Sequence, residues 1–453
     1  MRGLAAIIAT VAALIWSSLP AAASTYRVLY DFCPHAPACL DGAGPATNVI
    51  LDSKGDIFGT TQFGGRHNVG TIFELTPLGH GHYHHTVLHS FCLQRQCKDG
   101  QRPAGNLIID SSGSNLYGTT LTGAPETGGT AFKLSLVGSK KYQVLHQFDA
   151  HAEGADADYL TYIPQPGQLY YDGTSPLYAV AAEGGTPAQG GALMKLTLEP
   201  KTGKWDSTVL YQFCPASGCL DGQSPNPGLV FDSGNIYGTT KNGGANNSSG
   251  TVFKITPGAS QPETVLYNFC MQPSCPDGAN PVSGPVKDAN GNLWGVTPQM
   301  PQADGGGVLY ELVPPSAQST TWQSPFPPPH TFCLVRPPNC KDGSDANTTP
   351  AYGPSGTTLS GTLFGTTGAG GSINAHGGTV YEYGGGQYNV LHSFDFCSNA
   401  TSCTDGTTPS PSASLAMAVS GKYLNIFGAT VSGGKYNHGI VYAVAYEIPR
   451  KAP

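Results

Sequence analysis

The chain has 453 residues, of which 11% are charged, and its formal net charge is −7. Typical soluble chains carry about 25% charged residues, whereas this chain is rich in Gly (61) and Pro (37). No basic cluster is present, which argues against a nucleic-acid partner, because phosphate recognition needs concentrated Lys and Arg. The absence of a Gly-X-Y period excludes a collagen-like structure.

The N-terminus has the organisation of a secretory signal peptide. Arg2 precedes an apolar segment from Leu4 to Trp16 and the small-residue motif Ala21-Ala22-Ala23. The apolar segment is shorter than the ~20 residues that span a bilayer, and no later stretch comes closer. We therefore expect residues 1–23 to be removed. The mature chain should be secreted without a membrane span, into the extracellular space or a periplasm, and the short, Ala-rich signal is bacterial in style.

A unit of about 60 residues then recurs along the chain. Its cleanest copy, Val209 to Pro257, contains four runs rich in β-branched and aromatic residues, separated by Gly, Pro, Asn or Asp. Four strands per repeat is the content of one propeller blade. An aromatic-Gly step marks the seven copies: Phe58-Gly59, Tyr117-Gly118, Tyr178-Ala179, Tyr237-Gly238, Trp294-Gly295, Phe364-Gly365 and Phe427-Gly428. The sequence predicts an all-β fold, a seven-bladed β-propeller over residues 24–453.

The two ends of the chain predict how the ring closes. The first run, Tyr26 to Phe32, is a fourth strand without a preceding blade, and the last, Gly439 to Ala445, is a third strand without a successor. Pairing them removes two exposed strand edges. We therefore expect the last blade to combine one N-terminal strand with three C-terminal strands.

Two segments carry a resemblance to a known family. GLVFDSGNIYGTT at 228–240 and GTVFKITP at 250–257 resemble the hallmark of the GloVer (Gloeo-Verruco) repeats, a tandem family of bacterial secreted proteins. The resemblance extends over nearly the whole mature chain. It implies an exported, propeller-like array, and it brings no catalytic residues, cofactor or ligand with it.

All 12 Cys lie in pairs just after the run that begins each repeat, VLYQF in the copy at Val209, and only the third repeat lacks a pair. An even number of Cys in an exported chain, in register with the repeat, predicts local disulfides. Zinc binding is the alternative, but it needs four ligands together, which a ring would separate. The expected pairs are Cys33/Cys39, Cys92/Cys97, Cys214/Cys219, Cys270/Cys275, Cys333/Cys340 and Cys397/Cys403.

Two series of acidic residues recur with the repeat. We interpret both as turn residues, the first because each member precedes a Gly that can adopt positive φ. A calcium or glycosidase role is the alternative. The first series is Asp41, Asp99, Glu153, Asp221, Asp277, Asp342 and Asp405, and the second is Asp52, Asp110, Asp172, Asp232 and Asp288.

The remaining conspicuous residues also have structural interpretations. The aromatic residues of the aromatic-Gly steps recur in every repeat, so we expect packing between blades rather than a sugar-stacking belt. The histidine-rich run Gly79 to His85 is the one local metal candidate, since four neutral imidazoles could bind a divalent ion, but it lies in one hairpin with no matching carboxylate nearby in sequence. We therefore predict no metal or cofactor.

Departures from the repeat predict the ligand site, because loops carry function where strands carry packing. The third repeat replaces its Cys pair with DAHAEGADADY, and the fifth replaces GTT after its aromatic residue. We expect the site on the face of the Cys loops, where Gly-Gly loops converge with them. The predicted residues are Asp149, Glu153, Asp156, Asp158, Tyr159, Trp294 and Asp304. Decay of an unneeded repeat would explain the same departures.

No nucleophile-elbow or other catalytic signature appears in the sequence. The leading expectation is a monomeric, secreted binding module for glycans or for extracellular and surface proteins. The alternative is an extracellular polysaccharide-active enzyme, a glycoside hydrolase or lyase, with carboxylates at the mouth of the ring.

Overall fold

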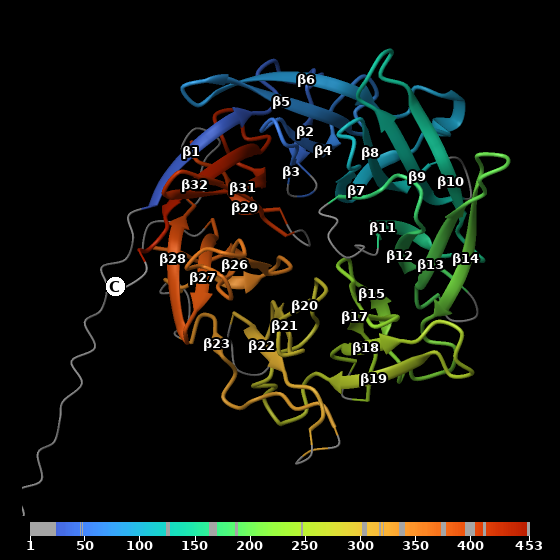
Figure 1. Ribbon diagram of the computed structural model, residues 1–453, viewed down its shortest axis with the longest axis vertical. Coiled ribbons are helices and arrows are strands. Elements are labelled where there is room, and N and C mark those ends of the chain that lie inside the picture. Colours follow the sequence, from blue (N-terminus) through green and yellow to red (C-terminus); the bar gives the residue numbers. More distant parts are fainter. Residues whose placement is uncertain are drawn as a thin grey trace, which may run out of the picture.

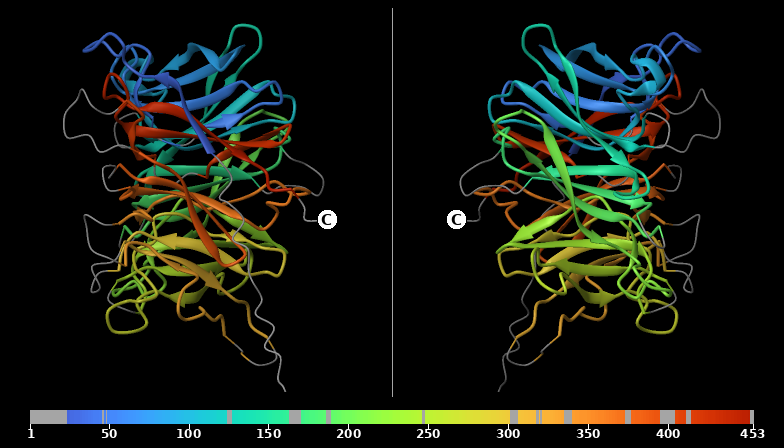
Figure 2. Two further views of the ribbon diagram at one scale, coloured as in Figure 1. Left: turned by 90° about the vertical axis from the view of Figure 1, so that its left-hand side faces the viewer. Right: turned by 90° about the vertical axis from the view of Figure 1, so that its right-hand side faces the viewer.

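The computed structural model describes residues 24–45, 47, 49–123, 127–162, 170–185, 189–245, 248–300, 306–316, 319, 321–334, 340–372, 377–394, 404–410 and 414–450. Within these residues the strands form seven antiparallel sheets arranged as a ring (Figure 1). Figure 2 shows this ring edge-on, with loops projecting from both faces. The prediction of an all-β, seven-bladed propeller is confirmed.

The blades are numbered in chain order, and each has its first strand nearest the ring axis. Blade 1 contains β2 (Ala43–Pro45), β3 (Ile50–Leu51), β4 (Ile57–Phe63), β5 (Thr71–Gly79) and β6 (His82–Ser90). Blade 2 contains β7 (Gln101–Ile109), β8 (Asn115–Thr122), β9 (Thr127–Ser135) and β10 (Tyr142–Asp149). Blade 3 contains β11 (Ala155–Tyr162), β12 (Leu177–Glu183), β13 (Ala192–Leu198) and β14 (Trp205–Gln212).

The other four blades repeat this arrangement. Blade 4 contains β15 (Gln223–Pro225), β16 (Val230–Asp232), β17 (Asn235–Asn242), β18 (Thr251–Ile255) and β19 (Glu263–Asn268). Blade 5 contains β20 (Val286–Lys287), β21 (Leu293–Thr297), β22 (Val308–Leu312) and β23 (His330–Thr331). Blade 6 contains β24 (Ser344–Ala346), β25 (Ala351–Tyr352), β26 (Leu363–Ala369), β27 (Thr379–Gly384) and β28 (Gln387–Ser393). Blade 7 contains β29 (Thr407–Pro409), β30 (Ala416–Ser420), β31 (Tyr423–Ser432), β32 (Ile440–Glu447) and β1 (Ser24–Asp31). A short 3₁₀ helix, Arg95–Cys97, lies between blades 1 and 2.

The predicted closure of the ring is confirmed. β1 pairs antiparallel with β32, in a register that runs from Ser24 opposite Tyr446 to Asp31 opposite Ile440. Figure 1 shows the blue N-terminal strand beside the red C-terminal strands. Because β1 completes blade 7, the sheet edge of β32 is paired with a strand from the other end of the chain.

The inner strand is longer than the sequence indicated and is interrupted. In four blades two short pieces pair with the same second strand, for example β15 and β16 with β17. The middle residue of each first piece has positive φ, at Gly44, Ser224, Asp345 and Thr408. A residue in this left-handed conformation breaks the regular strand, which explains why no continuous β run marks the first piece.

The packing explains the aromatic-Gly step. The glycine of β17, Gly238, lies under the ring of Phe253 from β18, and a Cβ at Gly238 would lie 2.5 Å from Phe253 Cζ. Blade 3 has Ala179 in place of the glycine, and its partner on the neighbouring strand is Met194 instead of an aromatic residue. The larger residue therefore occurs where no ring needs the space. Of the seven aromatic residues that form the steps, all except Trp294 are buried. The interpretation as packing residues is therefore confirmed for the buried six.

Residues 1–23, the predicted signal peptide, lie outside the described residues. In the described part of the chain, no helix is long and apolar enough to cross a membrane.

Candidate ligand-binding site

Five disulfides join neighbouring Cys in the loops between blades, as predicted. They are Cys33–Cys39, Cys92–Cys97, Cys214–Cys219, Cys270–Cys275 and Cys333–Cys340. The sixth expected pair, Cys397 and Cys403, lies outside the described residues. Each disulfide closes the loop that leads from the outer strand of one blade to the inner strand of the next. The loops therefore share one face of the ring, termed here the Cys face.

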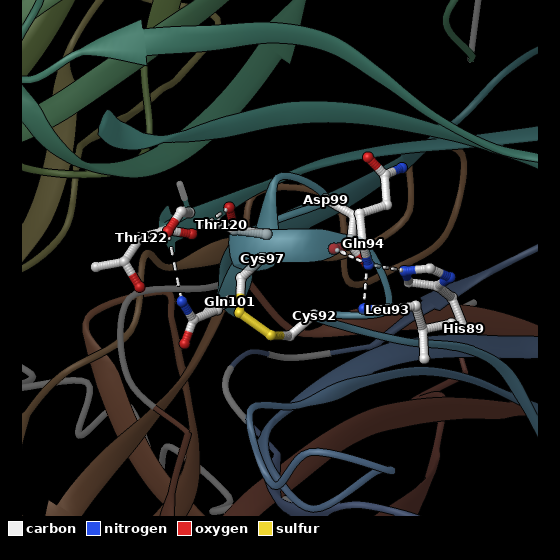
Figure 3. Close-up of a disulfide and its surroundings, with 10 residues drawn as sticks. His89, Cys92, Leu93, Gln94, Cys97, Asp99, Gln101, Thr120 and Thr122 are labelled. Carbon is white, nitrogen blue, oxygen red and sulfur yellow. Dashed lines mark hydrogen bonds and ion pairs between the residues drawn. A yellow bond between two sulfur atoms is a disulfide. The ribbon is translucent and has the colours of Figure 1, made fainter. Parts of the chain in front are cut away.

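An acidic residue fixes each of these loops from inside. In the Cys92–Cys97 loop, which Figure 3 shows, the Asp99 carboxylate accepts hydrogen bonds from the backbone amides of Leu93 (2.9 Å) and Gln94 (3.0 Å). His89 Nε2 lies 3.3 Å from Asp99 Oδ2. Burial alone would raise the pKa of Asp99, but the hydrogen bonds from His89 and the amides outweigh it and lower the pKa.

The same contact recurs at all seven junctions. A Tyr hydroxyl or His ring from the outer strand meets the acid of the following loop at 2.8–3.3 Å. The pairs are Tyr30–Asp41, His89–Asp99, His146–Glu153, Tyr211–Asp221, Tyr267–Asp277, His330–Asp342 and His392–Asp405. The glycine after every acid has positive φ. The turn interpretation is confirmed, and the carboxylates of this series are engaged by their own loops. Four members of the second series, Asp52, Asp110, Asp172 and Asp288, also cap turns; for example, Asp52 Oδ1 accepts from the amides of Lys54 and Asp56. The fifth, Asp232, forms an ion pair with Lys287.

Two of the predicted site residues have such structural roles. Glu153 binds His146 and the backbone amide of Asp149 (2.8 Å). The Asp149 side chain is 60% exposed and accepts hydrogen bonds from the amides of His151 and Ala152. Both residues stabilise the loop that lacks a disulfide. The sequence analysis did not predict that hydrogen bonds take the place of the disulfide in this loop.

Four further predicted residues cannot be placed by their side chains. Asp156, Asp158 and Tyr159 belong to strand β11, but their side chains lie outside the described residues, and so does the whole of Asp304. Their predicted role as ligand contacts stays a prediction.

The convergence of two loop sets on the Cys face is observed. The amides of Gly65, Gly244 and Gly371 each donate a 2.8 Å hydrogen bond to the carbonyl oxygen of the second Cys in the neighbouring disulfide loop. The Gly-Gly loops between second and third strands therefore support the Cys loops directly.

The histidine-rich run forms the hairpin between β5 and β6, where His85 packs on Tyr30 with ring centroids 4.3 Å apart. Burial lowers the pKa of His85 to about 4. Among the described residues, the one group of three metal-binding side chains close enough to share an ion is Cys33, Cys39 and His438. Two of its members form a disulfide, so this group cannot ligate a metal.

Trp294 lies at the opposite end of its blade. β20 runs away from the preceding Cys loop and turns at Asp288–Asn292, and Trp294 is the second residue after this turn. It is partly exposed and lines a groove of about 350 Å³ between blades 5 and 6. This groove faces away from the Cys face, so the structure does not bring Trp294 together with Asp149 and Glu153.

Three aromatic rings line this groove, termed here the 5/6 groove. Trp294 comes from blade 5, whereas Tyr352 of β25 and Tyr383 of β27 come from blade 6. The Trp294 and Tyr383 rings are tilted by 43°, with centroids 6.0 Å apart. The buried hydroxyl of Tyr352 has no hydrogen-bond partner among the described residues. The backbone of Gly384, Gly385 and Gly386 forms another part of the lining.

Two carboxylates stand beside these rings. The side-chain amide of Asn292 donates to Asp288 Oδ2 (3.0 Å) and to Glu311 Oε1 (2.7 Å), and Trp294 Nε1 lies 3.3 Å from Asp288 Oδ2. Burial and the charge of Asp288 raise the pKa of Glu311. Burial is the main cause that raises the pKa of Tyr352, and the charges of Asp288 and Glu311 raise it further. The 5/6 groove therefore combines apolar ring surface with negative charge.

Sequence reasoning found Trp294 but missed Tyr352, Tyr383 and Glu311. A signal for Tyr383 was present, because the third strand has Leu, Ile or Val at this position in the other six repeats, as at Leu75 and Leu312. The repeat positions of Tyr352 and Glu311 hold different residue types in different blades, so neither residue is recognisable as a departure from the repeat. Their significance comes from the blade contact that places them beside Trp294.

The closed ring of seven four-stranded sheets defines the protein as a seven-bladed β-propeller with disulfide-closed loops. The chain belongs to the family described as the Gloeobacter/Verrucomicrobia repeat, which matches residues 15–174 and 162–325. The resemblance read from the sequence is thereby confirmed. No curated protein sequence matches the chain.

Several solved structures are similar over most of the chain. Phage phi92 endosialidase has a TM-score of 0.45 and 11% identity, covering 95% of this chain and 70% of that one. Polysaccharide lyase Uly1 has a TM-score of 0.45 and 9% identity, covering 93% of each chain. The N-terminal domain of Nup159 has a TM-score of 0.43 and 10% identity, covering 94% and 97%. Similarity at this level gives no ground for transferring a function.

Proposed function

We propose that the protein is an exported glycan-binding module that binds its ligand in the 5/6 groove. The observation that carries this proposal is the exposure of Trp294, which is the one member of its repeat series that packing does not bury. In the other blades this position holds a buried ring. The departure at Trp294 coincides with a groove that has two further aromatic side chains.

The groove has the composition of a small-molecule site. Its volume of about 350 Å³ lies within the ~300–1,000 Å³ range of ligand pockets. Aromatic rings provide flat apolar surface for the C–H faces of a sugar, while Asp288 and the glycine backbone offer polar groups to its hydroxyls. The three rings lie on strands of the two sheets, and hydrogen-bonded strands hold them in place before a ligand binds, which reduces the entropy lost on binding.

Export agrees with the five disulfides, because disulfides persist in oxidising compartments outside the cytosol. The mature chain, residues 24–453, acts in this proposal as a single secreted propeller released from a signal peptide at residues 1–23. We propose a monomer, since ring closure leaves the edge of β32 paired within the same chain.

A glycan array followed by calorimetry with the purified chain tests the proposal. Trp294→Ala and Tyr383→Leu should each lower affinity at least about tenfold, since stacked rings at binding sites contribute ~1–2 kcal/mol or more. Tyr383→Leu restores the residue type found at this position in other blades, so it should fold normally.

The matched control is Tyr83→Leu in the groove between blades 7 and 1, which is lined by Arg27, Tyr83 and Phe427. It should leave binding unchanged. Failure of every glycan to bind, or binding that survives both groove variants, would overturn the proposal. Release of reducing or unsaturated sugar during the same assays would instead favour a polysaccharide-active enzyme.

A further inference from the structure

We infer that the 5/6 groove recognises a protonated amine, so that its glycan ligand carries unsubstituted amino sugars. This inference rests on the proposed glycan binding and specifies its chemistry. Three features support it: an unneutralised pair of carboxylates, aromatic rings around the same space, and a contrast with equivalent positions in other blades.

Asp288, which lines the groove, and Glu311 beside it have no cationic partner in the described part of the chain. Asp288 and Glu311 share the amide of Asn292, so that the two acids are held side by side. The nearest lysine in sequence, Lys287, is directed to another blade, where its Nζ lies 2.6 Å from Asp232 Oδ2. Charge complementarity therefore favours a cation as the occupant of the groove.

The aromatic rings reinforce this preference. Trp, Tyr and Phe rings attract ammonium groups through the negative potential of their faces, and Trp does so most strongly. Trp294, Tyr352 and Tyr383 line the same groove as Asp288, and Glu311 acts electrostatically on both tyrosines. Burial raises the pKa of Tyr383, with the charge of Glu311 as the second cause. A positive charge placed beside Asp288 and Glu311 would offset the repulsion between these two carboxylates.

The equivalent positions in other blades lack this arrangement. Glu74 lies opposite Phe58 in blade 1 as Glu311 lies opposite Trp294 in blade 5. Phe58 is buried, however, and Lys140 Nζ lies 3.4 Å from Glu74 Oε2. The groove between blades 7 and 1 is lined by Arg27 and no carboxylate. The acid without a cationic partner and the partly exposed tryptophan occur together at the 5/6 groove.

Three oligosaccharides of one length and one linkage separate charge from shape. Hexamers of β-1,4-linked glucose, N-acetylglucosamine and glucosamine differ at carbon 2, which carries a hydroxyl, an acetamide or an amine. Calorimetry at pH 6 and low salt should show the glucosamine hexamer binding at least about tenfold more tightly than the other two. Its affinity should fall as salt is added or as the pH is raised until the amine is neutral.

Glu311→Gln is the decisive variant. Glutamine keeps an oxygen for the Asn292 amide but removes the charge, so folding should be preserved. We expect it to reduce the preference for the amine, because only Asp288 of the pair then carries a charge, while binding of the glucose hexamer persists. Glu74→Gln, at the matched position of blade 1, should leave the preference intact.

The outcomes distinguish this inference from the proposed function. Equal binding of the three hexamers, or an amine preference unchanged in Glu311→Gln, would overturn the amine inference and leave glycan binding standing. Loss of all three ligands in Trp294→Ala with unchanged thermal unfolding would support the groove as the site. Absence of binding to any glycan would overturn both proposals.

Discussion

The ring of Tyr26 stacks on the ring of His392 with centroids 3.8 Å apart and planes within 4° of each other. Tyr26 belongs to the N-terminal strand β1 in blade 7, and His392 belongs to β28 in blade 6. The Tyr26 hydroxyl donates to the carbonyl oxygen of Asp405, and His392 Nε2 lies 3.1 Å from the carboxylate of the same residue. The closing strand is therefore bound to two blades.

The same contact joins blades elsewhere in the ring. Tyr142 stacks on His89 at 3.9 Å, and Tyr388 stacks on His330 at 3.9 Å. The hydroxyls of Tyr142 and Tyr388 donate to the backbone carbonyls of Asp99 and Asp342. The acid that fixes each of these loops thus also holds the outer strand of the next blade.

Deletion of Ser24–Asp31 should abolish cooperative unfolding, because it removes the strand that pairs with β32 and exposes that edge. Tyr26→Ala should cost about 1–3 kcal/mol through lost ring contact. Thermal denaturation and hydrogen exchange at β32 measure both effects. Tyr142→Ala is the control, because Tyr142 makes the same ring contact in blade 2, whose four strands follow one another in the chain. This variant should lower the free energy of unfolding without raising hydrogen exchange at β32. A deletion variant that unfolds like the parent would contradict the closure.

Gly238→Ala should destabilise the protein by about 1–3 kcal/mol, because the added methyl would lie 2.5 Å from Phe253 Cζ. Blade 3 suggests a compensating change, because Ala179 lies opposite the flexible side chain of Met194 in that blade. The double variant Gly238→Ala/Phe253→Met should recover part of the loss, which denaturant unfolding of the two single variants and the double variant measures. Strict additivity of the two single changes would show that the ring over glycine is not a coupled pair.

Stability should fall as the pH rises through 7 because of Glu263. Burial and the charge of Asp221 raise the pKa of this carboxyl from 4.5 to about 7, and its Oε1 has no hydrogen-bond partner among the described residues. The folded state therefore favours the protonated acid. Its contribution is fully present below about pH 4.5 and is lost as the pH rises through the folded pKa.

The variant Glu263→Gln tests this behaviour. It should remove the loss between pH 5 and 8, on the order of 1–2 kcal/mol after allowance for solvent screening. Unfolding in denaturant across this pH range measures the difference. An unchanged pH profile in the variant would show that another group titrates.

Asp99→Asn should destabilise by about 1–3 kcal/mol, because two loop amides and His89 lose a charged acceptor. The lowered pKa of Asp99 adds stability at neutral pH that is lost as the pH falls below about 4. The variant should lack that part of the acid dependence. For comparison, the joint change of Cys92 and Cys97 to Ala should cost about 2 kcal/mol with no acid dependence. Acid profiles of equal slope in the parent and Asp99→Asn would refute the role of the carboxylate.

The sequence determined the architecture because each blade repeats the same local chemistry. The aromatic-Gly steps, the Asp-Gly turns and the Cys pairs recur in register, so seven blades, the local disulfides and the closure by β1 and β32 could all be inferred from spacing. The glycines that follow Asp99 and Asp221 both have positive φ. This could be predicted from the sequence, because the turn itself requires the left-handed conformation that glycine adopts without steric cost.

The tertiary structure determined which residues from different strands, loops and blades lie next to one another. Whether Glu153 is a ligand contact or a partner of His146 depends on the distance between a strand and the following loop, which no local pattern states. Trp294 departs from the repeat in the sequence, but Tyr352 and Tyr383 join it because the sheets of blades 5 and 6 pack face to face. Burial of the other six rings and exposure of Trp294 likewise result from contacts between blades. The repeat therefore encodes the ring, while the junctions between unlike blades create the groove.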